Sequence, residues 1–140
     1  MYMDEMSPGE LVLARSRAFD AGDFAFIYES YHPDSNFRRM FPDRRAYLKY
    51  GEEVLSGDFR ILECRLLREE TSVLSAKVMF YLDTLYRGDR QQNIEVGYFV
   101  FDADRWFFMM SERGGAERFA EDPAGIGWDD FERLKDPGAF

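Results

Sequence analysis

The sequence predicts an α+β fold in which helices come first and an antiparallel sheet follows. Two observations support this prediction. Helix-start and helix-stop signals are concentrated before residue 58, whereas from Phe59 onward the chain is made of apolar, β-favouring runs. The length of 140 residues fits one domain that is large enough to bury a conventional core. We therefore expect three N-terminal helices packed against one antiparallel sheet.

Capping signals define the three expected helices. Ser7 can cap a helix that carries proline at its first position and glutamate three residues after the cap, and Gly22 can end it. Pro33 forces the residue before it out of the helical region and so ends the second helix. The helices should span about residues 7–21, 23–32 and 43–55, with an irregular or one-turn segment at 36–41.

The second part of the chain predicts four strands, at about residues 59–68, 73–86, 93–101 and 105–111. The turn-like segments YRGDRQ and FDADRW join the last three, which should form an antiparallel meander. The second strand is apolar on both sides, with Phe80 on one face and Met79 on the other. Both faces of the sheet should therefore be covered, and three helices can cover only one.

The C-terminal segment 120–140 is acidic and punctuated by proline and glycine. A short helical run is expected near 116–121. Further on, Trp128, Phe131 and Leu134 recur every three residues, which predicts a short amphipathic helix at about 127–135, docked on apolar surface. The uncovered outer face of the sheet predicts a homodimer.

Composition restricts the function classes. A formal charge of −9 repels phosphate backbones and anionic lipids, which argues against nucleic acid and membrane partners. The acidic N-terminus lacks the apolar core of a signal peptide, and we expect a cytoplasmic protein. Cys64 is the only cysteine and His32 the only histidine, so no disulfide, metal site or cofactor is predicted.

Short motifs resemble a known family. The opening SPGELVLARSRAFDAGDFAFIYESYHP and the later IEVGYFVFDADRW resemble the middle domain of bacterial SEC-C-motif-containing proteins, within the nuclear transport factor 2-like superfamily. The matching residues are Arg15-Ser16-Arg17, Phe19, Asp23, His32-Pro33, Glu95, Phe99 and Trp106. The resemblance implies a strongly curved sheet, the cystatin-like cone, over residues 7–119. It implies no activity, and the zinc-binding SEC-C segments of that family are absent here.

Four residues are candidates for a site in a pocket between the helices and the sheet: Tyr31, His32, Glu95 and Tyr98. His32 is either an acid–base residue or a residue that caps a helix end. Glu95 interrupts an apolar strand and is either its buried partner or a surface residue paired with an arginine. The length of the turn in YRGDRQ decides which face Glu95 takes, and the sequence leaves it open.

Two functions are compatible with these candidates. The first is non-enzymatic binding of a small molecule or a protein partner in the pocket. The alternative is a cofactor-independent isomerase, cyclase or hydrolase that uses His32 and Glu95 as an acid–base pair. A basic cluster could also receive an acidic peptide, although such a cluster is more often a solvated face. It consists of Arg38, Arg39, Arg44 and Arg45.

Overall fold

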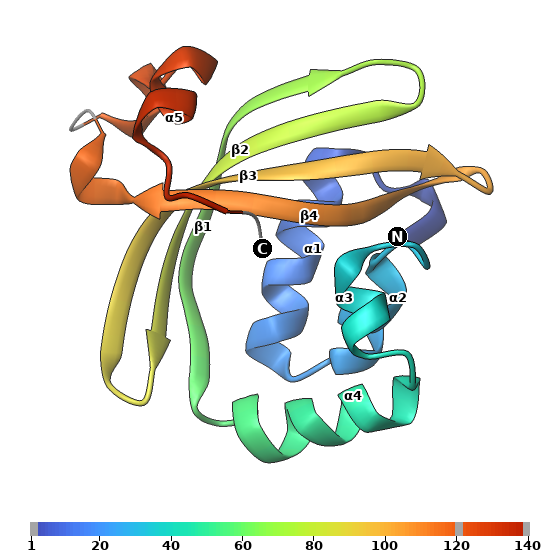
Figure 1. Cartoon of the computed structure of the whole chain (residues 1–140). Helices are drawn as coiled ribbons and strands as arrows, with labels where there is room; N and C mark the ends of the chain where they lie inside the picture. The colour runs from blue at the N-terminus through green and yellow to red at the C-terminus, as the bar shows by residue number, and fades with distance from the viewer. Residues whose placement is uncertain (1–2, 120–121, 139–140) are drawn as a thin grey trace.

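The computed structural model of the chain describes residues 3–119 and 122–138, and it places helices against an antiparallel sheet of four strands (Figure 1). The sheet is strongly curved and bends around α1. These features confirm the α+β class predicted from the sequence. No helix in the described residues is long and apolar enough to cross a membrane.

Helix α1 (Pro8–Ala21) forms where the capping signals predict it. The Ser7 hydroxyl accepts a hydrogen bond from the Glu10 amide at 3.2 Å, and the Glu10 carboxylate accepts one from the Ser7 amide at 3.1 Å. At the other end Gly22 takes a φ of 74°, a left-handed conformation that glycine adopts without steric cost. The first helix is therefore fixed at both ends by local sequence.

The chain then continues through α2 (Phe24–Ser30), α3 (Asn36–Met40) and α4 (Arg44–Tyr50). The one-turn helix α3 occupies the segment expected to be irregular or one turn long. Helix α4 runs on as a π-helical turn at Gly51–Leu55, so together they fill the third predicted helix. A Cβ at Gly51 would lie 2.4 Å from the ring of Phe24, so only glycine allows this close approach.

The sheet follows as an antiparallel meander in the spatial order β1-β2-β3-β4. Its strands are β1 (Phe59–Thr71), β2 (Ser75–Tyr86), β3 (Asp89–Asp102) and β4 (Arg105–Gly115). Two-residue turns with positive φ, at 87–88 and 103–104, close the last two hairpins. The first of these turns places Phe80 directly opposite Glu95. Strand β3 therefore begins four residues earlier than the sequence predicted.

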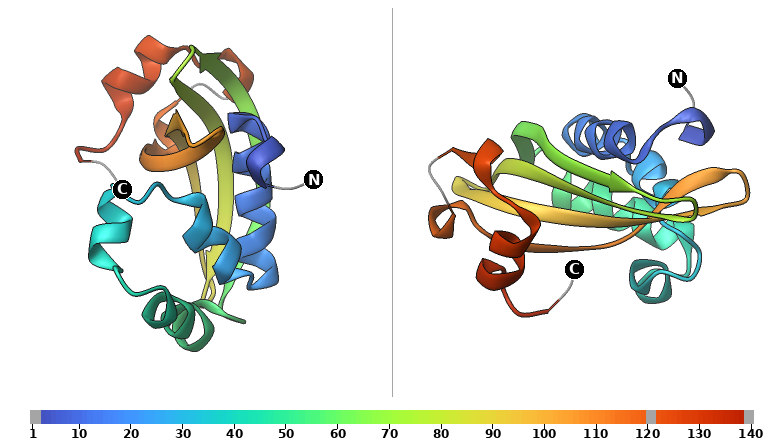
Figure 2. Two further views of the ribbon diagram at one scale, coloured as in Figure 1. Left: turned by 90° about the vertical axis from the view of Figure 1, so that its right-hand side faces the viewer. Right: turned by 90° about the horizontal axis from the view of Figure 1, so that it is seen from above.

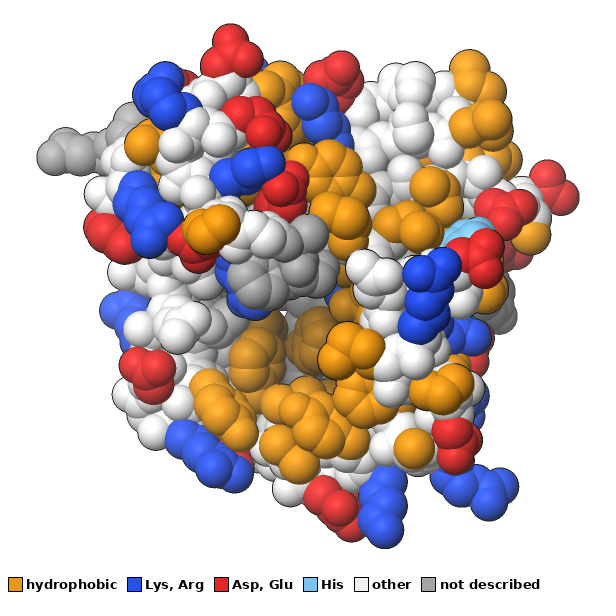
Figure 3. All heavy atoms as spheres, in the orientation of Figure 1, with side chains coloured by type: hydrophobic (Ala, Val, Ile, Leu, Met, Phe, Trp, Pro, Cys, Tyr) orange, Lys and Arg blue, Asp and Glu red, His pale blue; other side chains and the backbone are white. Residues whose placement is uncertain are grey.

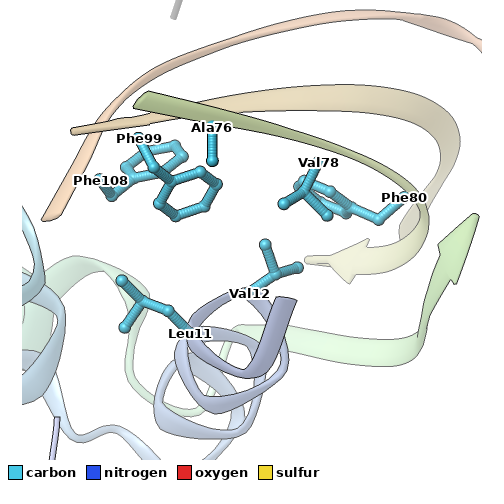
Figure 4. Packing of buried hydrophobic residues seen from close by; sticks show 7 residues of the cluster. All are labelled: Leu11, Val12, Ala76, Val78, Phe80, Phe99 and Phe108. Carbon is cyan, nitrogen blue, oxygen red and sulfur yellow. The ribbon is translucent and has the colours of Figure 1, made fainter. Parts of the chain in front are cut away.

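The two faces of the sheet pack against different partners, because successive side chains along a strand point to opposite faces. One face packs against α1, and Figure 4 shows Leu11 and Val12 pointing toward the strands. This cluster consists of Leu11, Val12, Ala76, Val78, Phe80, Phe99 and Phe108. The opposite face is covered by the C-terminal segment, which Figure 2 (right) shows across the sheet from α1.

The C-terminal segment contains α5 (Trp128–Leu134), at the place where the apolar spacing predicts a helix. Ile126 and Phe131 are each 1% exposed and join Met79, Tyr81, Ile94 and Val96 in one cluster. The ammonium group of Lys135 lies 2.6 Å from the Glu112 carboxylate on β4. The run expected at 116–121 is a single 3-10 turn at Ala116–Arg118, and residues 120–121 lie outside the described residues. The tail thus covers the outer face within the same chain.

Candidate functional site

A cavity of about 300 Å³ lies between α1 and the sheet. Its apolar walls come from α1 and from the strands β1, β2 and β4. They consist of Val12, Phe19, Ile61, Phe80, Leu82 and Phe108. Its polar lining consists of Arg15, Ser16, Tyr31, Cys64, Glu95, Ser111 and Arg113. An apolar enclosure with a few converging polar groups is the usual form of a small-molecule site.

A second chamber of about 330 Å³ adjoins the first. The two chambers share Leu82, Glu95 and Arg113 as lining residues, and the second continues toward Tyr50 and Tyr86. Figure 3 shows a hollow lined by hydrophobic side chains between the sheet and the helices. The shared wall means that a molecule in either chamber meets the same carboxyl and guanidinium groups.

Glu95 is the buried acid of this wall. It faces the cavity because it lies opposite Phe80, a member of the inward-facing set on β2. Its side chain is 10% exposed, and its carboxylate lies 3.8 Å from the guanidinium of Arg113. Burial raises the pKa of Glu95 to about 7, and the positive charges of Arg113 and Arg15 oppose that rise. A buried carboxyl that titrates near neutral pH can hold or release a proton inside the cavity.

Arg15 is a buried cation on the helical wall. Its guanidinium donates to the Ser30 hydroxyl at 2.5 Å and to the Tyr31 hydroxyl at 3.3 Å. It also lies over the ring of Phe108, with 3.9 Å from its central carbon to the ring centroid. Arg15 belongs to the Arg-Ser-Arg motif of the family resemblance, and that motif is the signal from which sequence reasoning could have chosen it.

Among the sequence candidates, Tyr31 and Glu95 line the cavity, and His32 does not. The His32 ring lies edge-on to Phe107, and its Nε2 atom is 2.8 Å from the Asp102 carboxylate. Asp102 is seven residues beyond Glu95 on β3, roughly 23 Å along the strand. The structure therefore does not bring His32 and Glu95 together as a pair.

Tyr98 lies on the opposite face of the sheet. Its hydroxyl donates to the Glu112 carboxylate at 2.6 Å, and that carboxylate also binds Lys135 of the tail. Tyr98 packs against the cluster that holds α5 in place. Its polar group therefore contacts the anchor of the tail rather than the cavity.

Cys64 lines the cavity from β1, and burial raises the pKa of its thiol to about 11. The thiol is therefore protonated at neutral pH and a poor nucleophile. Within residues 3–119 and 122–138, no three His, Cys, Asp or Glu side chains gather as a metal site would require.

The basic cluster is partly engaged within the fold. The guanidinium of Arg38 donates to the backbone carbonyl of Tyr31 and lies over the Tyr28 ring. The guanidinium of Arg44 pairs with Glu29 at 2.9 Å. Binding of an acidic peptide at this cluster stays a prediction.

Comparison with known proteins places the chain in a family context. The matching family is described as "YchJ, middle NTF2-like domain", and the match covers residues 7–111. Among solved structures, the chain is similar to a SEC-C motif containing protein from Rhodopseudomonas palustris. The TM-score is 0.60 with 26% sequence identity, over 76% of this chain and 77% of that one. A search of curated proteins found no significant match. The resemblance deduced from the sequence motifs is thus confirmed.

Proposed function

The chain belongs to the family of the YchJ middle NTF2-like domain, and we propose that it is a non-enzymatic binding domain for a small, largely apolar molecule. The cavity between α1 and the sheet carries this proposal. Six apolar side chains form part of its walls, Glu95, Arg113 and Ser111 supply polar groups from β3 and β4, and further polar groups come from the helical side. Such a lining can bury an apolar body and orient one polar end.

The lining favours binding over catalysis. The enzymatic alternative required His32 beside Glu95, and His32 instead pairs with Asp102 outside the cavity. The positively charged neighbours of Glu95 are guanidinium groups, which are poor general acids or bases. The cavity is therefore better suited to holding a ligand than to passing protons between two groups.

A neutral fluorescent probe, N-phenyl-1-naphthylamine, tests the proposal. We expect it to bind the intact chain with increased fluorescence, and Ser111→Phe should weaken binding about tenfold or more because the new ring occupies the cavity (roughly 1.4 kcal/mol). Ser16→Phe fills the same cavity from α1, in case the first variant does not fold. Ser72→Phe is the matched control, since Ser72 is exposed at a hairpin turn.

Equal probe affinity in the wild-type chain and in a folded cavity-filling variant would overturn the proposal. So would the absence of any probe binding. A loss of affinity in the Ser72→Phe control as large as in Ser111→Phe would show that the probe binds elsewhere and would count equally against it.

A further inference from the structure

We propose that the cavity selects small organic anions, which place an apolar body against its walls and an acidic group at the wall formed by Glu95 and Arg113. This inference rests on the proposed function and names the ligand class for the same site. The observation behind it is that the ionisable side chains lining the cavity have a net positive charge, whereas the chain as a whole is negatively charged.

The ionisable lining groups show this reversal. Arg15 and Arg113 contribute two positive charges to the first chamber, between α1 and the sheet, and Glu95 contributes at most one negative charge. The chain as a whole has a formal charge of −9. A low-dielectric enclosure strengthens the interaction of such charges with a ligand relative to water. An anion is therefore attracted to this cavity, although the net charge of the chain repels it.

The position of Arg113 gives the acidic group a defined place. Arg113 and Glu95 line both chambers, but Asp89 also lines the second, so an acidic group is favoured at this wall from the first chamber. Their closest N–O distance of 3.8 Å is longer than a hydrogen bond, so the two form a loose ion pair. A carboxylate or sulfonate that approaches within hydrogen-bonding distance would interact more strongly with the guanidinium than Glu95 does.

Binding of an anion should be coupled to a proton on Glu95. The charged and titratable groups that face Glu95 are Arg15 on α1, Arg113 on β4, Tyr31 after α2 and Cys64 on β1, with Tyr50, Tyr86 and Asp89 around the second chamber. A second negative charge beside Glu95 favours its neutral form, because like charges at close range repel. The pKa of Glu95 is already about 7 through burial, so the required proton is available at neutral pH.

Two probes that share a scaffold test this inference. 8-Anilinonaphthalene-1-sulfonate carries a sulfonate that N-phenyl-1-naphthylamine lacks. We expect the sulfonate probe to bind the intact chain more tightly at pH 6 than at pH 8, by about tenfold when one proton is taken up. The neutral probe should show equal affinity at both values. Glu95→Gln should remove the pH dependence, and its affinity for the sulfonate at pH 8 should match that of the wild type at pH 6.

The arginine of the wall gives a second measurement. Arg113→Gln should weaken the sulfonate probe severalfold more than it weakens the neutral probe, while the matched control, the exposed Arg118→Gln, should weaken neither. If the neutral probe binds and responds to Ser111→Phe but the sulfonate shows neither the pH dependence nor the loss in Arg113→Gln, the anion selectivity is wrong and the binding function stands. Sulfonate binding that persists in folded Ser111→Phe occurs on the outer surface and also overturns the inference. If neither probe enters the cavity, the binding function itself fails.

Discussion

The two faces of the sheet are built from alternate residues of the same strands, yet one encloses a cavity against α1 and the other packs against the C-terminal segment. Toward α1, the inward set includes Glu95 on β3, and the helix and sheet leave about 300 Å³ between them. On the opposite face, Met79, Ile94 and Val96 close against Ile126 and Phe131 of the tail. The comparison shows that Glu95 and Arg113 lie where the helix and the sheet leave space between them, whereas the carboxylate of Glu112 on the opposite face is bound by Lys135 of the tail.

Loss of the whole tail should have the largest effect. A chain that ends at residue 121 lacks Ile126 and Phe131, which are each 1% exposed and lie on the outer face. Burial of each large apolar side chain contributes about 1.5–3 kcal/mol, so the truncated chain should lose that much per side chain in urea unfolding. An equally stable truncated chain, with the tail amides unprotected in hydrogen exchange, would contradict the docked tail.

The same truncation tests the homodimer that the sequence predicts, and the docked tail changes the result expected for the intact chain. The tail covers the part of the outer face on which that prediction was based. We expect dimerisation to require release of the tail, because two copies cannot bury a surface that is already buried. Light scattering should give the 16.5 kDa chain mass for the intact protein and twice that mass after truncation at residue 121. A dimer of the intact chain would show that another surface forms the interface.

A single substitution should give the next largest effect. Phe131→Ala removes a ring that is 1% exposed and stacked near Phe119, so we expect a loss of about 3–5 kcal/mol in the free energy of unfolding. Phe101→Ala is the matched control, since Phe101 is 36% exposed at the end of β3 and should cost much less. Equal losses at the two positions would mean that the tail contributes no more than an exposed ring does.

On the cavity side, the main expected effect depends on pH. The pKa of Glu95 rises from 4.5 to about 7 in the fold, so the folded state binds more protons than the unfolded state between these values. The associated stability is fully present below about pH 4.5 and is lost as pH rises to about 7. Relative to Glu95→Gln, the wild type should lose roughly 3 kcal/mol over this interval. Urea unfolding at pH 4.5 and 7.5 measures it, with exposed Glu53→Gln as the control. If the wild type and Glu95→Gln differ in free energy of unfolding by the same amount at both pH values, burial does not raise the pKa of Glu95 as argued.

Much of the fold could be predicted because its signals are local. Ser7 specifies the start of α1 with its side-chain cap, and Gly22 specifies the end with its left-handed conformation. The apolar spacing in Trp128–Leu134 predicts α5 without any knowledge of the sheet. The face taken by Glu95 could not be predicted. It depends on a two-residue turn in which Arg87 takes a φ of 50°, a conformation that arginine does not signal. One more residue in that turn would have moved Glu95 to the other face.

The candidate site was harder to predict for a different reason. His32 was conspicuous because it is the only histidine, but rarity carries no information about position. Arg113 is one of 18 basic residues, and it enters the cavity only because β4 pairs with β3 in a register that sets it opposite Glu95. The contacts of Arg15 form only when α1, α2 and β4 pack together, because its guanidinium binds Ser30 and lies over the ring of Phe108. The motif Arg15-Ser16-Arg17 marks the residue, but these contacts between distant segments leave no pattern in the sequence that shows where its side chain lies.

The smallest expected effect concerns His32. The ring packs against Phe107, accepts a hydrogen bond from the Asp34 amide and lies 2.8 Å from the Asp102 carboxylate, and it does not line the cavity. His32→Ala should therefore cost about 1 kcal/mol, the usual value of a hydrogen bond, and it should leave the affinity for both naphthyl probes unchanged. Asp102→Ala should have a smaller effect once His32 is removed, because only the hydrogen bond from the Ala103 amide then remains to be lost. His32 also lowers the pKa of Asp102 through their hydrogen bond, so the contribution of this pair should be present at neutral pH and lost as the solution becomes acidic enough to protonate the carboxylate. A loss of several kcal/mol would show His32 to be part of the core, whereas a change in probe affinity would show that His32 contributes to the binding site.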